Sequence, residues 1–215
     1  MGTAGARFMV ARQVAASGGL FIEDGNTRIS LDPGPGAVVQ YAQRKIDLTT
    51  LDAIVVSHRH LDHVGDVNVM IEAMTDGGFS HRGRLFCPSD ALDEDPVVLK
   101  YLRRFPQEIV RLAPETSYSV NGLTFTTSGR HVHQVETYGF RFGHRLGWIT
   151  DSAYYEGIAE QHQADVMPAR HPDALWDGGL ASEPAGDRRR PYASDRDRGP
   201  GCARRDVARA VNTRL

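Results

Sequence analysis

Short apolar segments separated by polar turns recur along the first 167 residues of the chain. Where β-branched and aromatic residues cluster, or alternate with polar ones, the pattern predicts strands. Two of the turns place Gly beside Asn, at Gly25-Asn26 and Asn121-Gly122, which is typical of a tight β-hairpin. The predicted strands cover residues 20–23, 27–31, 53–56, 85–87, 108–112, 117–120, 123–127, 135–142, 145–150 and 164–167.

Helical spacing is clearest in residues 64–74, where apolar side chains recur every three or four positions from Val64 to Met74. Strands, hairpins and helices interleave along the chain. This order predicts an α/β or α+β domain built from layers. The other predicted helices are 37–45, 96–105 and 153–162.

Composition narrows the classes of function. A chain of 215 residues is long enough for one α/β domain with its own core. A hydrophobic content of 40% and a net charge of −2 fit a soluble globular protein, with no overall bias toward nucleic acid or a membrane. No apolar run approaches the roughly 20 residues that span a bilayer, and the N-terminus lacks a signal-peptide pattern. Cys87 and Cys202 indicate no disulfide framework, so we expect a cytoplasmic protein, with Cys87 buried as a small apolar residue.

The candidate chemistry follows the predicted strand at 53–56. Three imidazoles and one carboxylate occur within six positions, at His58, His60, Asp62 and His63. Imidazole and carboxylate are the groups that bind Zn²⁺ and similar metals. His58 and His60 project to the same side of an extended segment, whereas the last two residues follow a turn and can reach a second ion. This order favours a metal site over isolated surface or core histidines.

The His-x-His-x-Asp-His pattern after a hydrophobic strand resembles the signature of the metallo-β-lactamase superfamily. Three further segments resemble that family in the same chain order: the turn at Asp32-Pro33-Gly34, residues 133–141 and residues 148–152. The resemblance is greatest to the ribonuclease Z and phosphodiesterase-like branch. It implies an α/β fold, the αββα sandwich, with one or two metal ions at the edges of the sheets.

The resemblance also implies a ligand set and two zinc ions, with manganese or iron as alternatives. Asp62 would have two roles: it is one of the implied ligands, and it is the candidate to accept a proton from the attacking water. Asp32 would orient the ligand histidines from behind, and a simple turn Asp is the alternative interpretation. The implied ligands are His58, His60 and His133 for the first ion, Asp62 and His63 for the second, and Asp151 for both.

The remaining histidines fit the site less well. His131 precedes His133 by two residues and is an alternative ligand, although the Val-x-Thr-x-Gly pattern that follows favours His133. Members of the family place one more His after the bridging Asp. His171 is not assigned to that role, because Pro172 follows it and no apolar strand precedes it. We predict that His81, His144 and His162 are exposed loop or helix residues.

The resemblance implies a metal-dependent hydrolase that acts on a phosphodiester or other ester, either a small molecule or a nucleotide or RNA-type substrate. Two alternatives stay open: a catalytically impaired family member, and a thioesterase or lactonase, because a fold does not determine a substrate. We do not expect the protein to bind a membrane, and it could form a homodimer.

Both ends of the chain depart from the family pattern. The turn at residues 1–6 resembles the one that follows the first strand in the family, so the sandwich is expected to be incomplete, lacking that strand and the last strands and helix. Residues 1–167 would form the hydrolase domain. The Arg-, Pro- and Gly-rich tail at 168–215 has little apolar surface, and we interpret it as the product of a frameshift. A natural disordered tail and an arginine-rich arm for nucleic acid are the alternatives.

Overall fold

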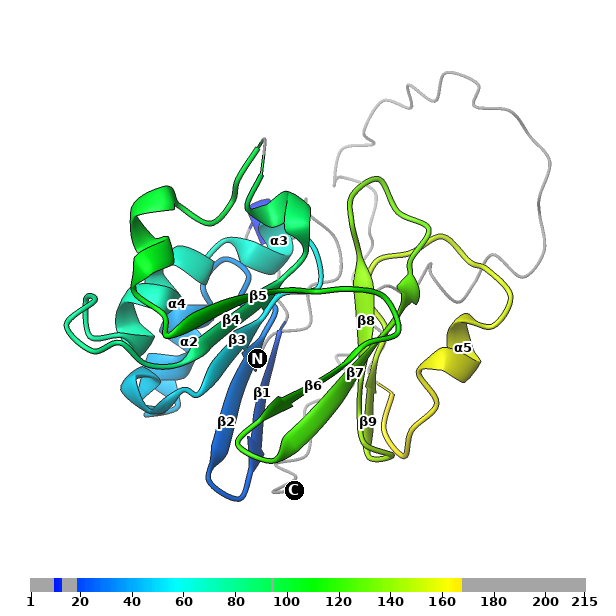
Figure 1. Ribbon diagram of the computed structural model, residues 1–215, viewed down its shortest axis with the longest axis horizontal. Helices are drawn as coiled ribbons and strands as arrows, with labels where there is room; N and C mark the ends of the chain where they lie inside the picture. The colour runs from blue at the N-terminus through cyan, green and yellow to red at the C-terminus, as the bar shows by residue number, and fades with distance from the viewer. Residues whose placement is uncertain (1–9, 13–18, 94, 168–215) are drawn as a thin grey trace, which may run out of the picture.

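Two β-sheets face each other; α-helices lie on the outer face of the first sheet, and one short helix, α5 (Ile158–Gln161), lies on the outer side of the second (Figure 1). The computed structural model describes residues 10–12, 19–93 and 95–167 of the chain. Over these residues the layers follow the order helix, sheet, sheet, helix. The predicted fold class, a layered α/β sandwich, is therefore confirmed.

Parts of the sequence-based predictions lie outside the described residues. These are the turn at 1–6, His171 and the tail at 168–215. Among the helices that the structure describes, none combines the length and the apolar character needed to cross a bilayer.

The first sheet has five strands in the order β1-β2-β3-β4-β5. β1 and β2 form an antiparallel hairpin whose turn includes Gly25 at a φ of 57°. β2, β3, β4 and β5 run parallel to one another, so the loops that leave β3 and β4 emerge at the same edge of the sheet. The strands are β1 Leu20–Asp24, β2 Thr27–Leu31, β3 Ala53–Val55, β4 Arg84–Cys87 and β5 Glu108–Arg111.

The second sheet is an antiparallel meander of four strands in the order β6-β7-β8-β9. The turn between β6 and β7 is the predicted one, with Asn121 at a φ of 48° and Gly122 at 92°. The register of β7 against β8 shifts between Thr127 and Arg130, just before the β7–β8 loop. The strands are β6 Ser117–Val120, β7 Leu123–Arg130, β8 Tyr138–Phe142 and β9 Leu146–Trp148.

Aromatic side chains fill the space between the sheets. Phe86 of β4 packs edge to face against Phe125 of β7, with ring centroids 5.3 Å apart. Phe125 also contacts Phe140 of β8 at 5.8 Å. All three rings are buried in a cluster to which both sheets contribute. This burial of apolar surface holds the two sheets face to face.

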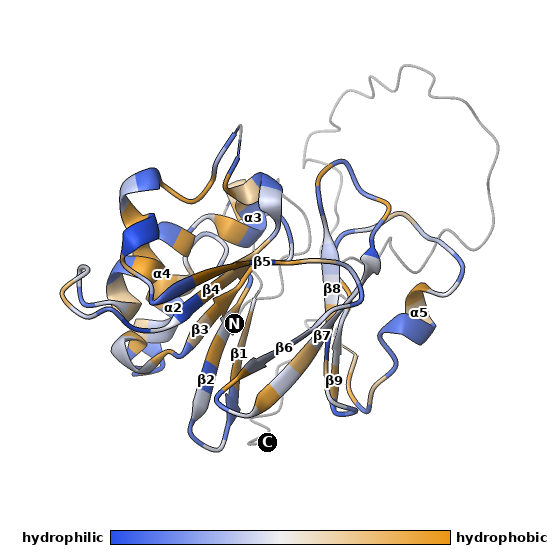
Figure 2. Cartoon of the chain, viewed as in Figure 1, coloured by the Kyte–Doolittle hydropathy of each residue, from blue (hydrophilic) through white to orange (hydrophobic). Residues whose placement is uncertain are grey.

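A second apolar cluster lies between the first sheet and its helices, where Met70 and Ile71 of one helix pack with Ile54 and Leu85. Figure 2 shows apolar residues along these strands and on the adjacent helices. The α-helices are α2 Ala37–Gln43, α3 Leu61–Val64, α4 Val67–Met74 and α5 Ile158–Gln161. The 3-10 helices are η1 Leu48–Thr50, η2 Ser89–Ala91 and η3 Lys100–Arg104.

The helix predicted at 64–74 is divided into α3 and α4. α3 begins inside the histidine motif, earlier than predicted. The side chain of Pro35 occupies the space beside Gly65 that a larger residue would fill. The backbone N–H of Asp66 donates to the carbonyl of Pro33 at 3.0 Å rather than continuing the helix. Contact with the turn after β2 thus interrupts the helix, which the apolar spacing alone did not indicate.

Several other predicted elements are shorter than their sequence patterns suggested. Residues 96–105 form only η3, and residues 153–162 form only α5, which starts after Gly157 at a φ of 92°. Residues 164–167 make a single bridge, between Val166 and Leu146, rather than a strand. The predicted burial of Cys87 is confirmed.

The prediction that His162 is exposed is wrong, because the structure buries it completely. Its Nδ1 lies 2.7 Å from the carbonyl oxygen of Ile158, so the Nδ1–H donates to that oxygen. A Cβ at Gly139 would meet the imidazole, and a Cβ at Gly147 would meet the His162 carbonyl oxygen. The His162 side chain therefore packs against the backbone at Gly139, and its main chain packs against the backbone at Gly147, two strand positions where a larger residue would clash.

Burial lowers the pKa of His162 from its ordinary value of 6.5, with a smaller contribution from Arg141, against the hydrogen bond to Ile158. The folded protein therefore binds this proton less readily than the unfolded chain does. The free energy of unfolding should fall as the pH decreases below about 6.5, and should keep falling until the folded-state pKa is passed.

We expect His162→Gln to remove part of this acid sensitivity, because a neutral amide has no proton to gain. The measurement is chemical denaturation of the metal-free protein at several pH values between 7.5 and about 5. His81→Gln, which replaces an exposed histidine, is the control. An unchanged pH dependence in the His162 variant would contradict the buried neutral imidazole.

Candidate metal centre

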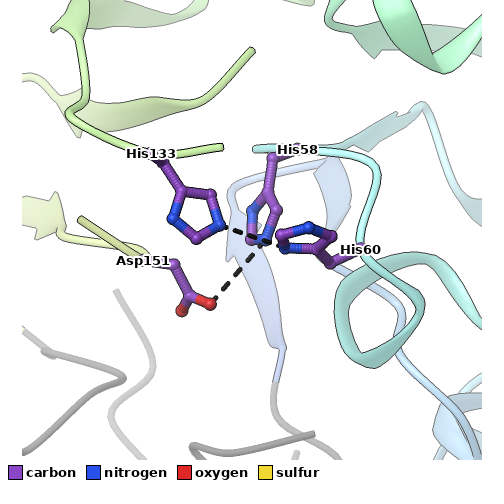
Figure 3. Close-up of side chains that lie close together, drawn as sticks. All are labelled: His58, His60, His133 and Asp151. Carbon is purple, nitrogen blue, oxygen red and sulfur yellow. Dashed lines mark hydrogen bonds and ion pairs between the residues drawn. The ribbon is translucent and has the colours of Figure 1, made fainter. Parts of the chain in front are cut away.

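Segments from both sheets bring the predicted ligand residues to one place. His58 and His60 lie in the loop that leaves β3, and Asp62 lies on the adjoining α3. The second sheet contributes His133 from the β7–β8 loop and Asp151 from the chain after β9. Figure 3 shows three imidazoles and one carboxylate from these segments converging on a common space.

The first group consists of His58, His60, His133 and Asp151, whose ligand atoms all lie within 4.8 Å of one another. His133 Nε2 is 3.0 Å from His60 Nδ1, and His58 Nε2 is 3.8 Å from Asp151 Oδ2. His58 is fully buried, whereas the other three members are partly exposed. The group is therefore buried at His58, whereas solvent reaches its other three members.

The second group consists of Asp62, His63 and Asp151, again within 4.8 Å. His63 Nε2 is 3.6 Å from Asp62 Oδ2 and 3.5 Å from Asp151 Oδ1. Asp151 belongs to both groups, and its two oxygens face different ones: Oδ2 faces His58 and Oδ1 faces His63.

These separations fit the coordination of metal ions. Two atoms bound to one Zn²⁺ at roughly 2.0–2.1 Å in a tetrahedral arrangement lie about 3.3 Å apart. Two distances in the first group lie on either side of this value: 3.0 Å between His60 Nδ1 and His133 Nε2, and 3.8 Å between His58 Nε2 and Asp151 Oδ2. Imidazole and carboxylate donors in this arrangement suit borderline divalent metals.

A buried carboxylate orients two of the imidazoles from behind. Asp32 is fully buried and has a φ of 49°, a left-handed conformation that is uncommon outside glycine. It accepts hydrogen bonds from the Ser57 N–H at 2.7 Å, the Ser57 hydroxyl at 2.8 Å and Trp148 Nε1 at 3.2 Å. His63 Nδ1 lies 3.0 Å away. A proton on Nδ1 leaves Nε2 as an acceptor directed toward Asp62 and Asp151.

Ser57 extends this arrangement to His58. The Ser57 hydroxyl donates to Asp32 and lies 3.0 Å from His58 Nδ1. It can therefore accept the Nδ1–H of His58, which directs Nε2 toward Asp151. Thr150 Oγ1 lies a further 3.2 Å from the same hydroxyl. Sequence reasoning assigned no role to Ser57, Thr150 or Trp148, although each adjoins a predicted ligand or lies near one in sequence.

The structure separates His131 from the first group. Its ring lies beside those of Tyr155 and His162, with centroids 6.1 and 5.2 Å away, and it is buried. Burial, with a smaller contribution from His162, lowers the pKa of His131 to about 4. His133, not His131, is the one grouped with His58 and His60. His81 and His144 are exposed, as predicted.

A family model described as a beta-lactamase superfamily domain matches residues 27–183 of the chain. The protein belongs to this family. An uncharacterised protein of Methanocaldococcus jannaschii, MJ1374, is 31% identical over 165 residues. That alignment covers 74% of the present chain but 60% of the relative, so the chain spans about three-fifths of the relative's length.

Solved structures agree with the family in fold. The metallo-β-lactamase fold protein YhfI of Bacillus subtilis matches with a TM-score of 0.59 and 22% identity, over 71% of this chain and 62% of YhfI. A structure described as a new diphosphatase from the PhnP family matches with a TM-score of 0.54 and 21% identity, over 71% of this chain and 60% of that one. The resemblance to the metallo-β-lactamase superfamily that the sequence motifs indicated is thus confirmed.

Replacing Asp32 with Asn should disturb the imidazole protonation that the carboxylate imposes. An amide presents one acceptor and one donor where several donors now converge, which should destabilise the metal-free protein by about 1–3 kcal/mol. The substitution should also reduce the fraction of molecules in which His63 carries its proton on Nδ1. Nitrogen-15 NMR of the imidazoles measures the tautomer, and thermal unfolding measures the stability.

Asp47→Asn is the control for this experiment. Asp47 is an exposed carboxylate that belongs to neither ligand group, and its side chain accepts from the backbone N–H of Thr49 at 2.9 Å. An Asp32→Asn protein with the tautomer populations of the Asp47→Asn protein would show that Asp32 does not orient His63.

Proposed function

We propose that this protein is a metal-dependent hydrolase that acts on a phosphodiester or another ester. The observation that supports the proposal is the pair of ligand groups that share Asp151, one oxygen facing each group. Adjacent cation sites with a common carboxylate are the arrangement that two-metal hydrolases use.

The first group would hold one cation through His58, His60 and His133, and Asp151 would contribute to both cations. Bound divalent ions would supply Lewis acidity, which lowers the pKa of a nearby water and stabilises negative charge on an ester oxygen. Zinc suits the imidazole-rich first group, and manganese or iron could replace it.

The two groups differ in composition, and so should their affinities. Three imidazoles and one carboxylate form the first group, whereas the second has a single imidazole, from His63, with Asp62 and Asp151. Among the described residues no further histidine joins the second group. We therefore expect the second cation to bind more weakly than the first.

We propose that Asp62 accepts the proton that hydrolysis releases from water. It lies on α3 with 3% of its surface exposed, and its Oδ2 is 3.6 Å from His63 Nε2. A carboxylate has two oxygens, so one can bind a cation while the other accepts a proton. We assign Asp62 this role in the proposed reaction.

A phosphodiester is the first substrate class to test, because the sequence motifs resemble the phosphodiesterase-like branch and one of the structural relatives is described as a diphosphatase, which also acts on a phosphate bond. Metal content by elemental analysis and turnover of bis(p-nitrophenyl) phosphate should be measured on the same preparation. Two bound metals with turnover support the proposal. Metal binding with turnover of thioesters or lactones, and none of the phosphodiester, would move the substrate class. Absence of bound metal would overturn the proposal.

His60→Ala should remove most of the metal at the first group, because it deletes one of three imidazoles. Asp151→Asn should lower the affinity for both cations without disrupting the fold, since a neutral amide cannot share a negative charge between them. His81→Ala, in an exposed loop, is the control. Metal content in the His60 and Asp151 variants equal to that of the His81 variant would reject the ligand assignment.

A further inference from the structure

Two carboxylates outside the ligand groups form a reciprocal contact beside the site. Glu136 lies in the β7–β8 loop, three residues after His133, and Asp90 lies in η2, just after β4. Glu136 Oε2 accepts from the backbone N–H of Ser89 at 3.0 Å and from that of Asp90 at 3.4 Å. In return the backbone N–H of Glu136 donates to Asp90 Oδ2 at 3.0 Å. Each carboxylate thus holds the backbone of the other segment.

Arg59 connects this contact to the histidine motif. Its Nε lies 3.3 Å from Asp90 Oδ2, and its Nη1 lies 2.8 Å from Asp95 Oδ2. Arg59 occupies the position between His58 and His60. A continuous set of contacts therefore runs from the backbone beside His60, through Arg59 and Asp90, to Glu136 in the loop that carries His133.

Tyr138 fixes the other end of Glu136. The Tyr138 hydroxyl donates to Glu136 Oε1 at 2.8 Å, and the Tyr138 backbone N–H donates to the carbonyl of Ser57 at 3.1 Å. Burial, followed by the hydrogen bond to Glu136, raises the pKa of the Tyr138 hydroxyl, so this group remains a donor. Both oxygens of Glu136 consequently have defined partners, and the loop is tied to β8 as well as to η2.

We propose that Glu136 and Asp90 are positioning residues that set the separation of His60 and His133, and thereby the affinity of the first group for its metal ion. The proposal rests on the proposed function, because it assumes that this group binds metal. It extends that function by naming residues that hold the ligands of one ion and not those of the other.

The selectivity follows from where the cross-sheet contacts lie. Trp148 reaches Asp32, which contacts His63 of the second group. The contact between Glu136 and Asp90 instead joins the loop that carries His133 to η2. Arg59 in turn joins η2 to the segment that carries His60, whose ring nitrogen lies 3.0 Å from that of His133. Loss of Glu136 should therefore loosen the His60–His133 pair and leave the network around Asp32 in place.

The test is a Co²⁺ titration of the full-length protein, followed by visible absorption. His133→Ala identifies the absorption that belongs to the first ion. Glu136→Ala should lower the affinity for the first ion by about 10–100-fold, the range typical of residues that support metal ligands. The affinity for the second ion should change by less than about threefold. Thermal unfolding of the metal-free variants shows whether the fold is intact.

Two further variants separate positioning from a loss of charge or a general loss of structure. Glu136→Gln keeps an acceptor for the Ser89 N–H and should recover most of the affinity. Asp93→Asn is the matched control, because Asp93 is a carboxylate in the same segment whose partner is Arg111, at 2.9 Å. Its metal affinities should equal those of the parent protein.

The outcomes distinguish this inference from the proposed function. A parent protein that binds no metal overturns both. A parent that binds two ions, with a Glu136→Ala variant that binds the first equally tightly, overturns only the positioning role. Equal losses at both ions, or a Gln variant as impaired as the Ala variant, also overturn it, because a general loss of structure or of charge would then explain the result.

Discussion

The hydrogen-bonded Asp32 carboxylate is the interaction on which the arrangement of the site depends. It lies at the end of β2, is fully buried and takes donors from the first sheet, through Ser57, and from the second, through Trp148. A buried carboxylate is tolerated only when such donors stabilise its charge. The same group lies beside His63 Nδ1. One residue therefore joins the two sheets and orients an imidazole of the candidate centre.

The motif residues were predictable because their positions follow from strand geometry. A strand that ends before His58 directs His58 and His60 to one side, and the turn into α3 redirects Asp62 and His63. The structure brings these residues together with His133 and Asp151 in two groups of possible ligands, whereas the division into two ligand sets came from the family resemblance and not from strand geometry. The layered fold was likewise predictable, since the order of strands, hairpins and helices restricts the packing of the layers.

What the sequence did not predict depends on contacts between distant segments. Glu136 and Asp90 are 46 positions apart, and neither carries a local signal for the other. His162 is buried because Gly139 and Gly147 leave room for it on two strands, a fit that no local pattern reveals. The division between α3 and α4 has a similar cause, since Pro35 packs against Gly65. In each case tertiary packing overrides the local pattern.

The division of each ligand group between the two sheets has a consequence for how the protein acquires its chemistry. The first sheet supplies the complete histidine motif, yet each group also needs Asp151 from the second sheet. A nascent chain that has folded only through β5 would carry every residue of the motif and no complete centre. Metal that binds the assembled groups would favour the docked sheets over every partly folded state. Bound metal would then stabilise the contact between the two sheets, and retention of the metal would indicate that both sheets have folded and docked.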